Sequence, residues 1–125
     1  MMNKTDIQTL DDIKQLVDQF YDKVRHNTLI GPIFNGVIKD KWPEHLDKMY
    51  RFWESLLLGN NTYNGRPFPP HAHLPVQAEH FEQWKALFFE TVDENFQGEV
   101  ADMAKWRAAK IAEVFLAKIT YFQNQ

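Results

Sequence analysis

Apolar residues recur at intervals of three and four along most of the chain, which is the spacing of one face of an α-helix. The first run predicts a helix over about residues 11–26. Thr9, with Asp12 three residues later, predicts a capping box at its start, with Asp in place of the usual Glu. The Gly31-Pro32 pair then predicts a turn over residues 29–34, whose apolar side chains fold inward. The apolar face of the first helix comprises Ile13, Leu16, Val17, Phe20 and Val24.

Three further runs predict three more helices. The second helix begins near Trp42, where Pro43 suits a first helical turn, and ends at Gly59, which suits a C-terminal cap. The third covers about residues 77–95, and the fourth about residues 99–121. Their stripes are, in chain order, His45, Met49, Phe52, Trp53, Leu56 and Leu57; then Phe81, Trp84, Phe88 and Val92; then Val100, Met103, Arg107, Ile111, Val114, Phe115 and Ile119.

Residues 60–75 interrupt the helical pattern. This segment holds Pro67, Pro69, Pro70 and Pro75, and no long helix can cross it because proline lacks the backbone N–H and clashes with the preceding turn. A regular four-helix bundle favours short connections, whereas a loop of this length in a compact domain is often functional. The pattern therefore predicts an all-α protein with a single domain over residues 1–125, in which about residues 1–8 form a polar N-terminal extension.

The composition narrows the classes of function. With 44% hydrophobic residues among 125, the chain is long enough to build one core and is not expected to be disordered. Its net charge of −3, without a Lys/Arg cluster, gives no footprint for nucleic acid. The absence of Cys excludes disulfides, Cys-ligated zinc, iron–sulfur clusters and C-x-x-C-H haem attachment. Neither a signal peptide nor a membrane-spanning apolar run is present, so a soluble cytoplasmic protein is expected.

Three of the five histidines, His71, His73 and His80, lie where residues 60–75 meet the third predicted helix. By composition they could form a zinc site, but no Asp or Glu lies at a recognisable ligand spacing and H-E-x-x-H is absent. A histidine in a loop is more often solvated or a helix cap than a metal ligand. The residues alone leave open whether one of them points at a core, a metal ion or the iron of a cofactor.

Other candidate residues also have simple structural interpretations. Tyr21 suits a half-buried boundary position, Trp84 suits a core position where its N–H needs a partner, and His45 suits a core or rim position. Lys48 and Arg51 flank the face that carries His45 and could meet an anionic cofactor group at its rim. No G-x-S-x-G, P-loop or G-x-G-x-x-G motif supports a catalytic alternative.

In their order and spacing, these residues resemble a group III truncated haemoglobin, a shortened globin with a two-over-two helical sandwich. The resemblance extends from about residue 13 to residue 122. In that family a loop largely replaces the helix that bears the iron-ligating histidine, which agrees with residues 60–75. The matching segments are Phe20-Tyr21, Gly31-Pro32-Ile33-Phe34, His45, Phe52-Trp53, Leu57-Leu58-Gly59, Tyr63-Asn64-Gly65, His71-x-x-Leu74-Pro75 and His80-Phe81-x-x-Trp84-x-x-Leu87-Phe88.

The resemblance assigns roles by position. It implies that His71 is the proximal iron ligand, after the long loop, and that Tyr21 is the distal-pocket tyrosine. It implies that Trp84 faces the other side of the haem, where the gas binds. Phe34 would stack on the haem, and His45 would be the histidine of the distal helix. The remaining cofactor contacts would be Met49, Phe52, Trp53, Phe81 and Phe88, with Lys48 at the rim.

The implied function is reversible binding of oxygen, nitric oxide, carbon monoxide or cyanide at a five-coordinate, b-type haem. Hydrogen bonds from Tyr21 and Trp84 would slow oxygen release and favour nitric oxide dioxygenation or peroxide reduction, with a separate reductase. His45 would gate ligand entry or supply a proton. Two rival interpretations remain. One is a haem-free helical interaction domain, and the other is a small metal-binding enzyme that uses His71, His73 and His80.

Overall fold

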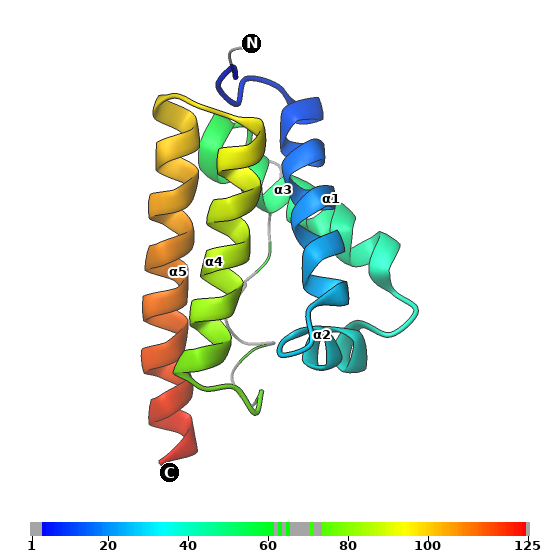
Figure 1. The fold of residues 1–125 in the computed structure, drawn as a ribbon, viewed down its shortest axis with the longest axis vertical. Helices are drawn as coiled ribbons and strands as arrows, with labels where there is room; N and C mark the ends of the chain where they lie inside the picture. Colours follow the sequence, from blue (N-terminus) through cyan, green and yellow to red (C-terminus); the bar gives the residue numbers. More distant parts are fainter. Residues whose placement is uncertain (1–3, 62, 64, 66–70, 72–73, 125) are drawn as a thin grey trace.

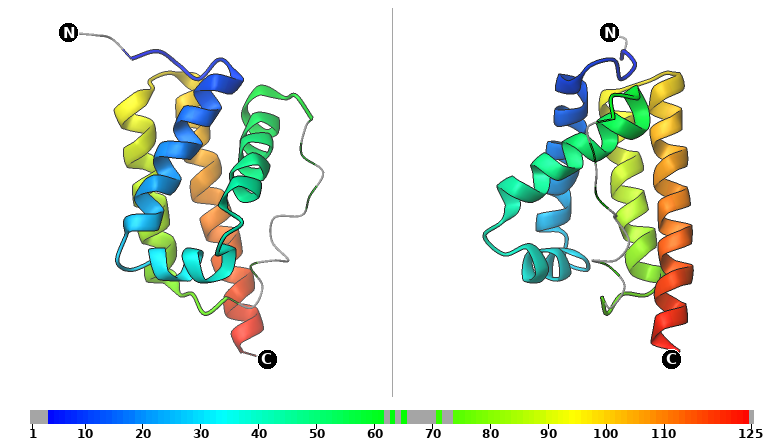
Figure 2. Two further views of the ribbon diagram at one scale, coloured as in Figure 1. Left: turned by 90° about the vertical axis from the view of Figure 1, so that its right-hand side faces the viewer. Right: turned by 180° about the vertical axis from the view of Figure 1, so that it is seen from behind.

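The fold consists of α-helices packed in two pairs (Figures 1 and 2). The computed structural model describes residues 4–61, 63, 65, 71 and 74–124. The helix α1 packs against α3, the helix α4 packs against α5, and contacts between α1 and α4 join the two pairs. The predicted all-α, two-over-two arrangement is therefore confirmed. The helices within the described residues are α1 (Leu10–His26), α2 (Gly31–Ile38), α3 (Trp42–Leu58), α4 (Ala78–Asn95) and α5 (Glu99–Gln123).

Local sequence signals place most helix ends. The predicted capping box is present at the start of α1, where Thr9 accepts a hydrogen bond from the Asp12 backbone N–H (3.2 Å) and Asp12 accepts one from that of Thr9 (3.1 Å). Pro43 lies in the first turn of α3, where its missing N–H costs no helical hydrogen bond. Gly59 ends α3 with φ 73°, a left-handed conformation that favours glycine.

The short helix α2 occupies residues for which the sequence pattern predicts a turn. The Gly-Pro pair begins the helix instead of ending one, because Pro32 lies in the first turn of α2. The reversal lies earlier, where the Asn27 side chain accepts hydrogen bonds from the backbone N–H groups of Leu29 and Ile30 (both 3.0 Å). The N-cap Ile30 and the apolar residues of α2 share the helical spacing that identified the other elements; the residues of α2 are Ile33, Phe34, Val37 and Ile38.

The N-terminal segment belongs to the packed structure from residue 4 onward. Ile7 is buried in the core, so residues 4–8 are not a polar extension free of the domain. The Asp6 carboxylate accepts hydrogen bonds from the backbone N–H groups of Val100 (2.9 Å) and Ala101 (2.8 Å), and so caps α5. Burial acts to raise the pKa of Asp6, but these hydrogen bonds outweigh it and hold that pKa below its usual value.

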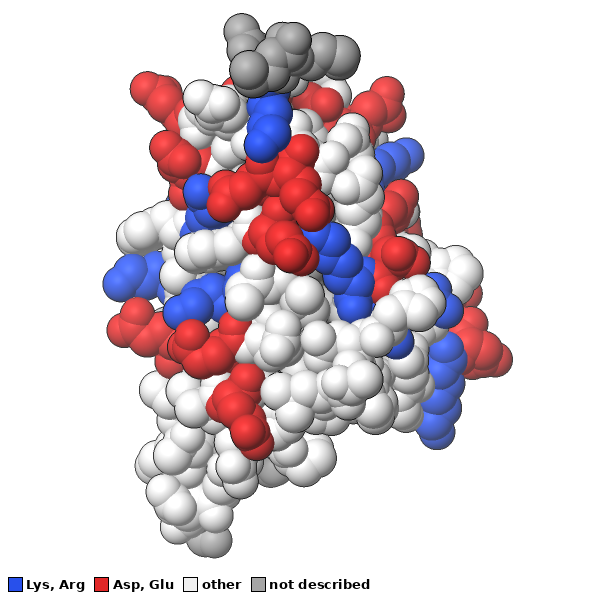
Figure 3. Space-filling view, in the orientation of Figure 1, with Lys and Arg blue, Asp and Glu red and all other residues white. Residues whose placement is uncertain are grey.

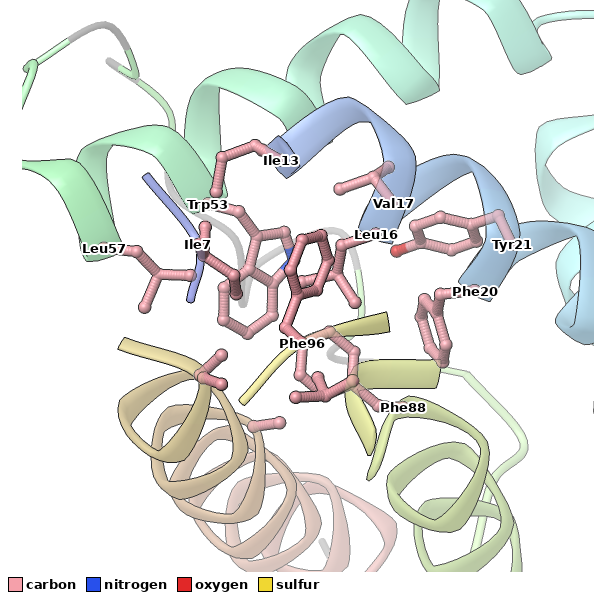
Figure 4. Packing of buried hydrophobic residues seen from close by; sticks show 14 of the residues in the cluster. Ile7, Ile13, Leu16, Val17, Phe20, Tyr21, Trp53, Leu57, Phe88 and Phe96 are labelled. Atoms are coloured by element: carbon pink, nitrogen blue, oxygen red, sulfur yellow. The ribbon is translucent and has the colours of Figure 1, made fainter. Parts of the chain in front are cut away.

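The core lies between the two helix pairs, as Figure 4 shows. Phe20 of α1 and Phe88 of α4 are almost fully buried there, and their rings meet edge to face with centroids 5.2 Å apart. Trp53 of α3 stacks on Phe88 at 4.8 Å, while Ile7 fills the space nearby. The core is thus rich in large aromatic rings whose orientations are fixed by their neighbours.

Ion pairs between helices lie on the surface over this core. Lys23 of α1 pairs with Glu90 of α4 at 2.9 Å, and Lys105 of α5 pairs with Asp93 of α4 at 2.8 Å. In Figure 3 the acidic side chains on this face are interspersed with Lys and Arg. Exposed pairs of this kind contribute about 0–1 kcal/mol each, so apolar packing dominates the stability. Among the described residues, no helix has the length and apolar character needed to span a membrane.

Candidate functional site

A largely apolar cavity of about 610 Å³ lies between the helix pairs, a size typical of sites that hold a small molecule or cofactor. All five helices and the histidine at position 71 contribute to its lining. The structure thus brings together residues that are far apart in the sequence. The predicted site residues that line it are Tyr21, Phe34, His45, Lys48, Met49, Phe52, Trp53, His71, Phe81 and Trp84.

Phe88 lies behind this wall instead of on it. The ring is completely buried and does not line the cavity. It stacks on Trp53 with centroids 4.8 Å apart and on Trp84 at 6.0 Å, and both of these tryptophans do line the cavity. Phe88 therefore supports the orientation of two cavity residues without reaching the space they enclose.

His71 is held by its backbone and its ring. Its carbonyl oxygen accepts a hydrogen bond from the Leu74 backbone N–H (3.1 Å). Its imidazole lies against the ring of Phe115 on α5, with centroids 5.1 Å apart. An imidazole at a cavity wall can offer a ring nitrogen to a metal when it is unprotonated.

The α1 and α3 walls of the cavity bring a hydroxyl and an imidazole together. Tyr21 is 5% exposed, so it is buried and not at the boundary that its sequence position indicates. Its ring meets that of His45 edge to face, with centroids 5.1 Å apart. Burial raises the pKa of Tyr21 above its usual value, which keeps the O–H protonated and able to donate. Among the described residues, none accepts a hydrogen bond from the Tyr21 hydroxyl or from the Trp84 indole N–H.

The Nε2 atom of His45 is buried and has no hydrogen-bond partner among the described residues. Burial lowers the pKa of this imidazole to about 4, and the nearby charges of His71 and Lys48 lower it in the same direction. A buried polar atom without a partner costs about 1–3 kcal/mol, so it needs an explanation. A polar ligand held in the cavity would supply the missing partner.

The residues at the cavity edge add positive charge. Lys48 and Arg51 both line the cavity, and their side chains are exposed at its rim. Arg51 pairs with Asp47 at 3.0 Å, an exposed contact that an incoming carboxylate could replace. A cavity with apolar walls, an imidazole on the wall and cations at the rim fits a flat, apolar group that carries a metal and carboxylates. The residues present therefore fit a haem.

Several lining residues are not among those predicted for the site. Ile33 and Val37 of α2 belong to the segment for which a turn is predicted, although their spacing could have indicated a helix with one apolar face. Phe115 belongs to the predicted stripe of the fourth helix, but its contact with His71 spans 44 positions of the chain, from 71 to 115. No local pattern could have indicated such a contact.

Two of the three histidines of the alternative metal site, His71 and His80, belong to the described residues. His80 lines the cavity, but its Nδ1 accepts the Gln77 backbone N–H at 2.9 Å in the capping box of α4. His73 lies outside the described residues. Within the part of the chain that the structure describes, no group of three or more His, Cys, Asp or Glu could hold a metal ion.

Comparison with known proteins shows the family of the chain. The sequence matches the bacterial-like globin family over residues 6–115. The chain belongs to this globin family. The globin is 39% identical over 107 residues to a group 3 truncated haemoglobin of Campylobacter jejuni, an alignment that covers 82% of this chain and 84% of the relative. It is also 34% identical over 71 residues to a group 1 truncated haemoglobin of a Nostoc species, covering 56% of this chain and 58% of the relative.

Comparison of the fold with solved structures also indicates a truncated globin. A crystal structure of a group III truncated haemoglobin from Campylobacter jejuni matches this globin with a TM-score of 0.85 and 36% sequence identity. The match covers 94% of this chain and 95% of the other. The resemblance to group III truncated haemoglobins is thereby confirmed. As a member of the globin family the protein binds haem, and globins bind diatomic gases such as oxygen as ligands of the haem iron.

Proposed function

We propose that this globin binds oxygen and other diatomic gases reversibly at a b-type haem, with His71 as the one iron ligand from the protein. The observation that carries the proposal is the buried, unpartnered Nε2 of His45 beside Tyr21, in the same cavity as His71. If His71 were the single ligand that the protein gives to the iron, Tyr21 and His45 would be available to contact a gas bound there.

Different residues would contact the iron, the macrocycle and the propionates of the haem. His71 would hold the iron, while Phe34, Phe52 and Phe81 would contact the apolar faces of the macrocycle. Lys48 would pair with a propionate at the rim, as would Arg51 after release from Asp47. When bound, the haem supplies an iron centre that holds diatomic ligands and takes part in their redox chemistry.

Tyr21 and Trp84 would supply hydrogen-bond donors in a cavity whose walls are largely apolar. A hydrogen bond in such surroundings is stronger than one in water, and each donor would contribute on the order of 1 kcal/mol, about fivefold in affinity. Slow release of oxygen favours nitric oxide dioxygenation or peroxide reduction over rapid oxygen delivery. A separate reductase would return the oxidised protein to its working state.

His45 would act as a neutral group at neutral pH. An imidazole with a pKa of about 4 is almost entirely unprotonated at pH 7, so it is not the resting reservoir of a proton. Its place in the cavity wall, three residues before Lys48 at the rim, suits control of ligand entry. Of the two roles that the resemblance implies for His45, we therefore propose gating.

An absorption spectrum tests the proposed function directly. Purified protein supplied with haem is expected to show a Soret band that shifts when the reduced protein is exposed to carbon monoxide. The absence of such a band would contradict the proposal and favour a haem-free interaction domain. Stopped-flow mixing of the oxygenated protein with nitric oxide, and of the ferric protein with peroxide, then decides between the two redox reactions.

Substitution of the donors tests how the pocket holds oxygen. Tyr21→Phe and Trp84→Phe are each expected to raise the oxygen dissociation rate about fivefold, because each removes one hydrogen bond to the ligand. The rate is measured by stopped-flow displacement of oxygen with carbon monoxide. Tyr50→Phe is the matched control, because its hydroxyl donates to Asp18 outside the cavity, and the rate should stay that of the parent protein. Unchanged rates in both Tyr21→Phe and Trp84→Phe would refute the hydrogen-bond account.

A further inference from the structure

Three aromatic rings of the α1 and α3 walls contact one another in a closed triangle. Ring centroids lie 5.1 Å apart for Tyr21 and His45, 5.8 Å for Tyr21 and Trp42, and 5.6 Å for Trp42 and His45. All three pairs meet edge to face, with interplanar angles of 60° to 89°. Tyr21 and His45 line the cavity, whereas Trp42 does not. Trp42 therefore supports the other two rings from outside the cavity.

Trp42 is itself anchored to two other helices. Its indole N–H donates to the Asn35 side-chain oxygen of α2 at 3.2 Å, and the Arg25 guanidinium of α1 lies 4.7 Å from its ring centre. The Asn35 amide donates in turn to the backbone carbonyl of Arg25 at 3.2 Å. With 6% of its surface exposed, Trp42 is fixed between the end of α1, the middle of α2 and the start of α3.

Two opposing effects act on the orientation of the His45 imidazole. Its Nε2 is buried without a partner among the described residues, so hydration of that atom favours rotation of the imidazole out of the cavity. The edge-to-face contacts with Tyr21 and Trp42 act in the opposite direction. In the parent protein the ring contacts keep the imidazole inside the cavity, and their loss would let it turn outward to water.

We propose that Trp42 is a positioning residue that holds His45 inside the cavity and thereby slows the entry of gaseous ligands. The role rests on the proposed function, because it matters only if a ligand enters this cavity to reach haem. Asn35 and Arg25 act on His45 indirectly, because they contact Trp42 and fix the ring that contacts His45.

The test uses the haem-loaded protein with carbon monoxide as the probe. The parent is expected to show a single infrared stretching band for the bound carbon monoxide, because His45 keeps one position. Trp42→Leu removes both ring contacts and should add a second band, from molecules with His45 turned outward. Association of carbon monoxide should become about tenfold faster, the effect of losing two edge contacts. Trp42→Phe and Asn35→Ala, which keep part of the support, should shift the rate in the same direction by about twofold.

Two further variants separate a positioning role from general destabilisation. Phe96→Leu alters a buried core residue that does not line the cavity, and should keep the single band and the parent rate. In a His45→Leu background, Trp42→Leu should change the association rate by less than about twofold, because the group through which it acts is gone. A full tenfold effect in that background would overturn the proposal.

Failure of the positioning role and failure of the proposed function give different results. A parent protein that takes up no haem refutes the proposed function, and the positioning role of Trp42 is then refuted as well. A parent that binds carbon monoxide, while Trp42→Leu, Trp42→Phe and Asn35→Ala all leave the band and the rate unchanged, refutes the positioning role alone. If Trp42→Leu does not fold, the infrared bands and association rates of Trp42→Phe and Asn35→Ala still test the positioning role.

Discussion

Replacement of His71 by glycine is expected to abolish stable haem binding, with a loss of more than about a hundredfold in affinity. Even removal of a group that only supports a metal ligand costs about 10–100-fold, so removal of the ligand itself should cost more. The measurement is haem transfer from the variant to an excess of an acceptor globin, followed through the Soret band. Because glycine leaves space where the imidazole was, imidazole added to the solution should enter it and restore the spectrum of the parent.

The chain offers a matched control for this substitution. His80 also lines the cavity, but its ring nitrogen serves the capping box of α4. Glutamine at the same position of a capping box can make the equivalent hydrogen bond, so His80→Gln removes an imidazole and keeps the helix start. It should retain haem as the parent does. If His80→Gln lost haem while His71→Gly kept it, the assignment of the iron ligand would be wrong.

Replacement of Phe88 by alanine is expected to lower the free energy of unfolding by about 3–5 kcal/mol, a large part of the stability of a small domain. Phe88 is completely buried, and its ring stacks on Trp53 and on Trp84 and meets Phe20 edge to face. Truncation leaves a void next to two cavity-lining tryptophans, so haem retention should weaken as well. Urea unfolding of the haem-free protein measures the first effect.

The expected loss of stability in Phe88→Ala depends on how tightly the ring is packed. A series of substitutions of graded size tests this dependence. Phe88→Leu keeps much of the buried volume and should cost roughly 1–1.5 kcal/mol. Trp106→Ala removes a larger ring from a half-exposed position on α5, and should cost about 1 kcal/mol or less. Equal losses in Phe88→Ala and Trp106→Ala would show that the Trp53–Phe88–Trp84 stack contributes nothing specific.

Part of this structure follows from signals that act over a few residues. The stripe from Ile13 to Val24 predicts the buried face of α1, and the pair of Thr9 and Asp12 predicts its first turn. Gly59 marks the end of α3 because its backbone enters the left-handed region. These features can be predicted from the sequence because capping and helical periodicity depend only on residues within about one turn of each other.

Other features depend on contacts that no local pattern contains. Ile7 and Asp6 occur in a short polar stretch, yet one joins the core and the other caps a helix that begins at Glu99. The turn predicted at Gly31-Pro32 fails for a related reason, because the same pair can end one helix or begin another. Which of the two occurs depends on where the chain can place an apolar face against the rest of the fold.

The sequence by itself determined the helical class, most helix ends and, through the order of its motifs, the resemblance to group III truncated haemoglobins, including ten of the residues that line the cavity. Only the tertiary structure placed Phe88 behind the cavity, left Nε2 of His45 without a partner and enclosed Trp42 between Arg25 and Asn35. The physical reason is that helical patterns tell which face of a helix is buried. The direction of a ring and the partner of a polar atom on that face depend on which distant residues pack against it.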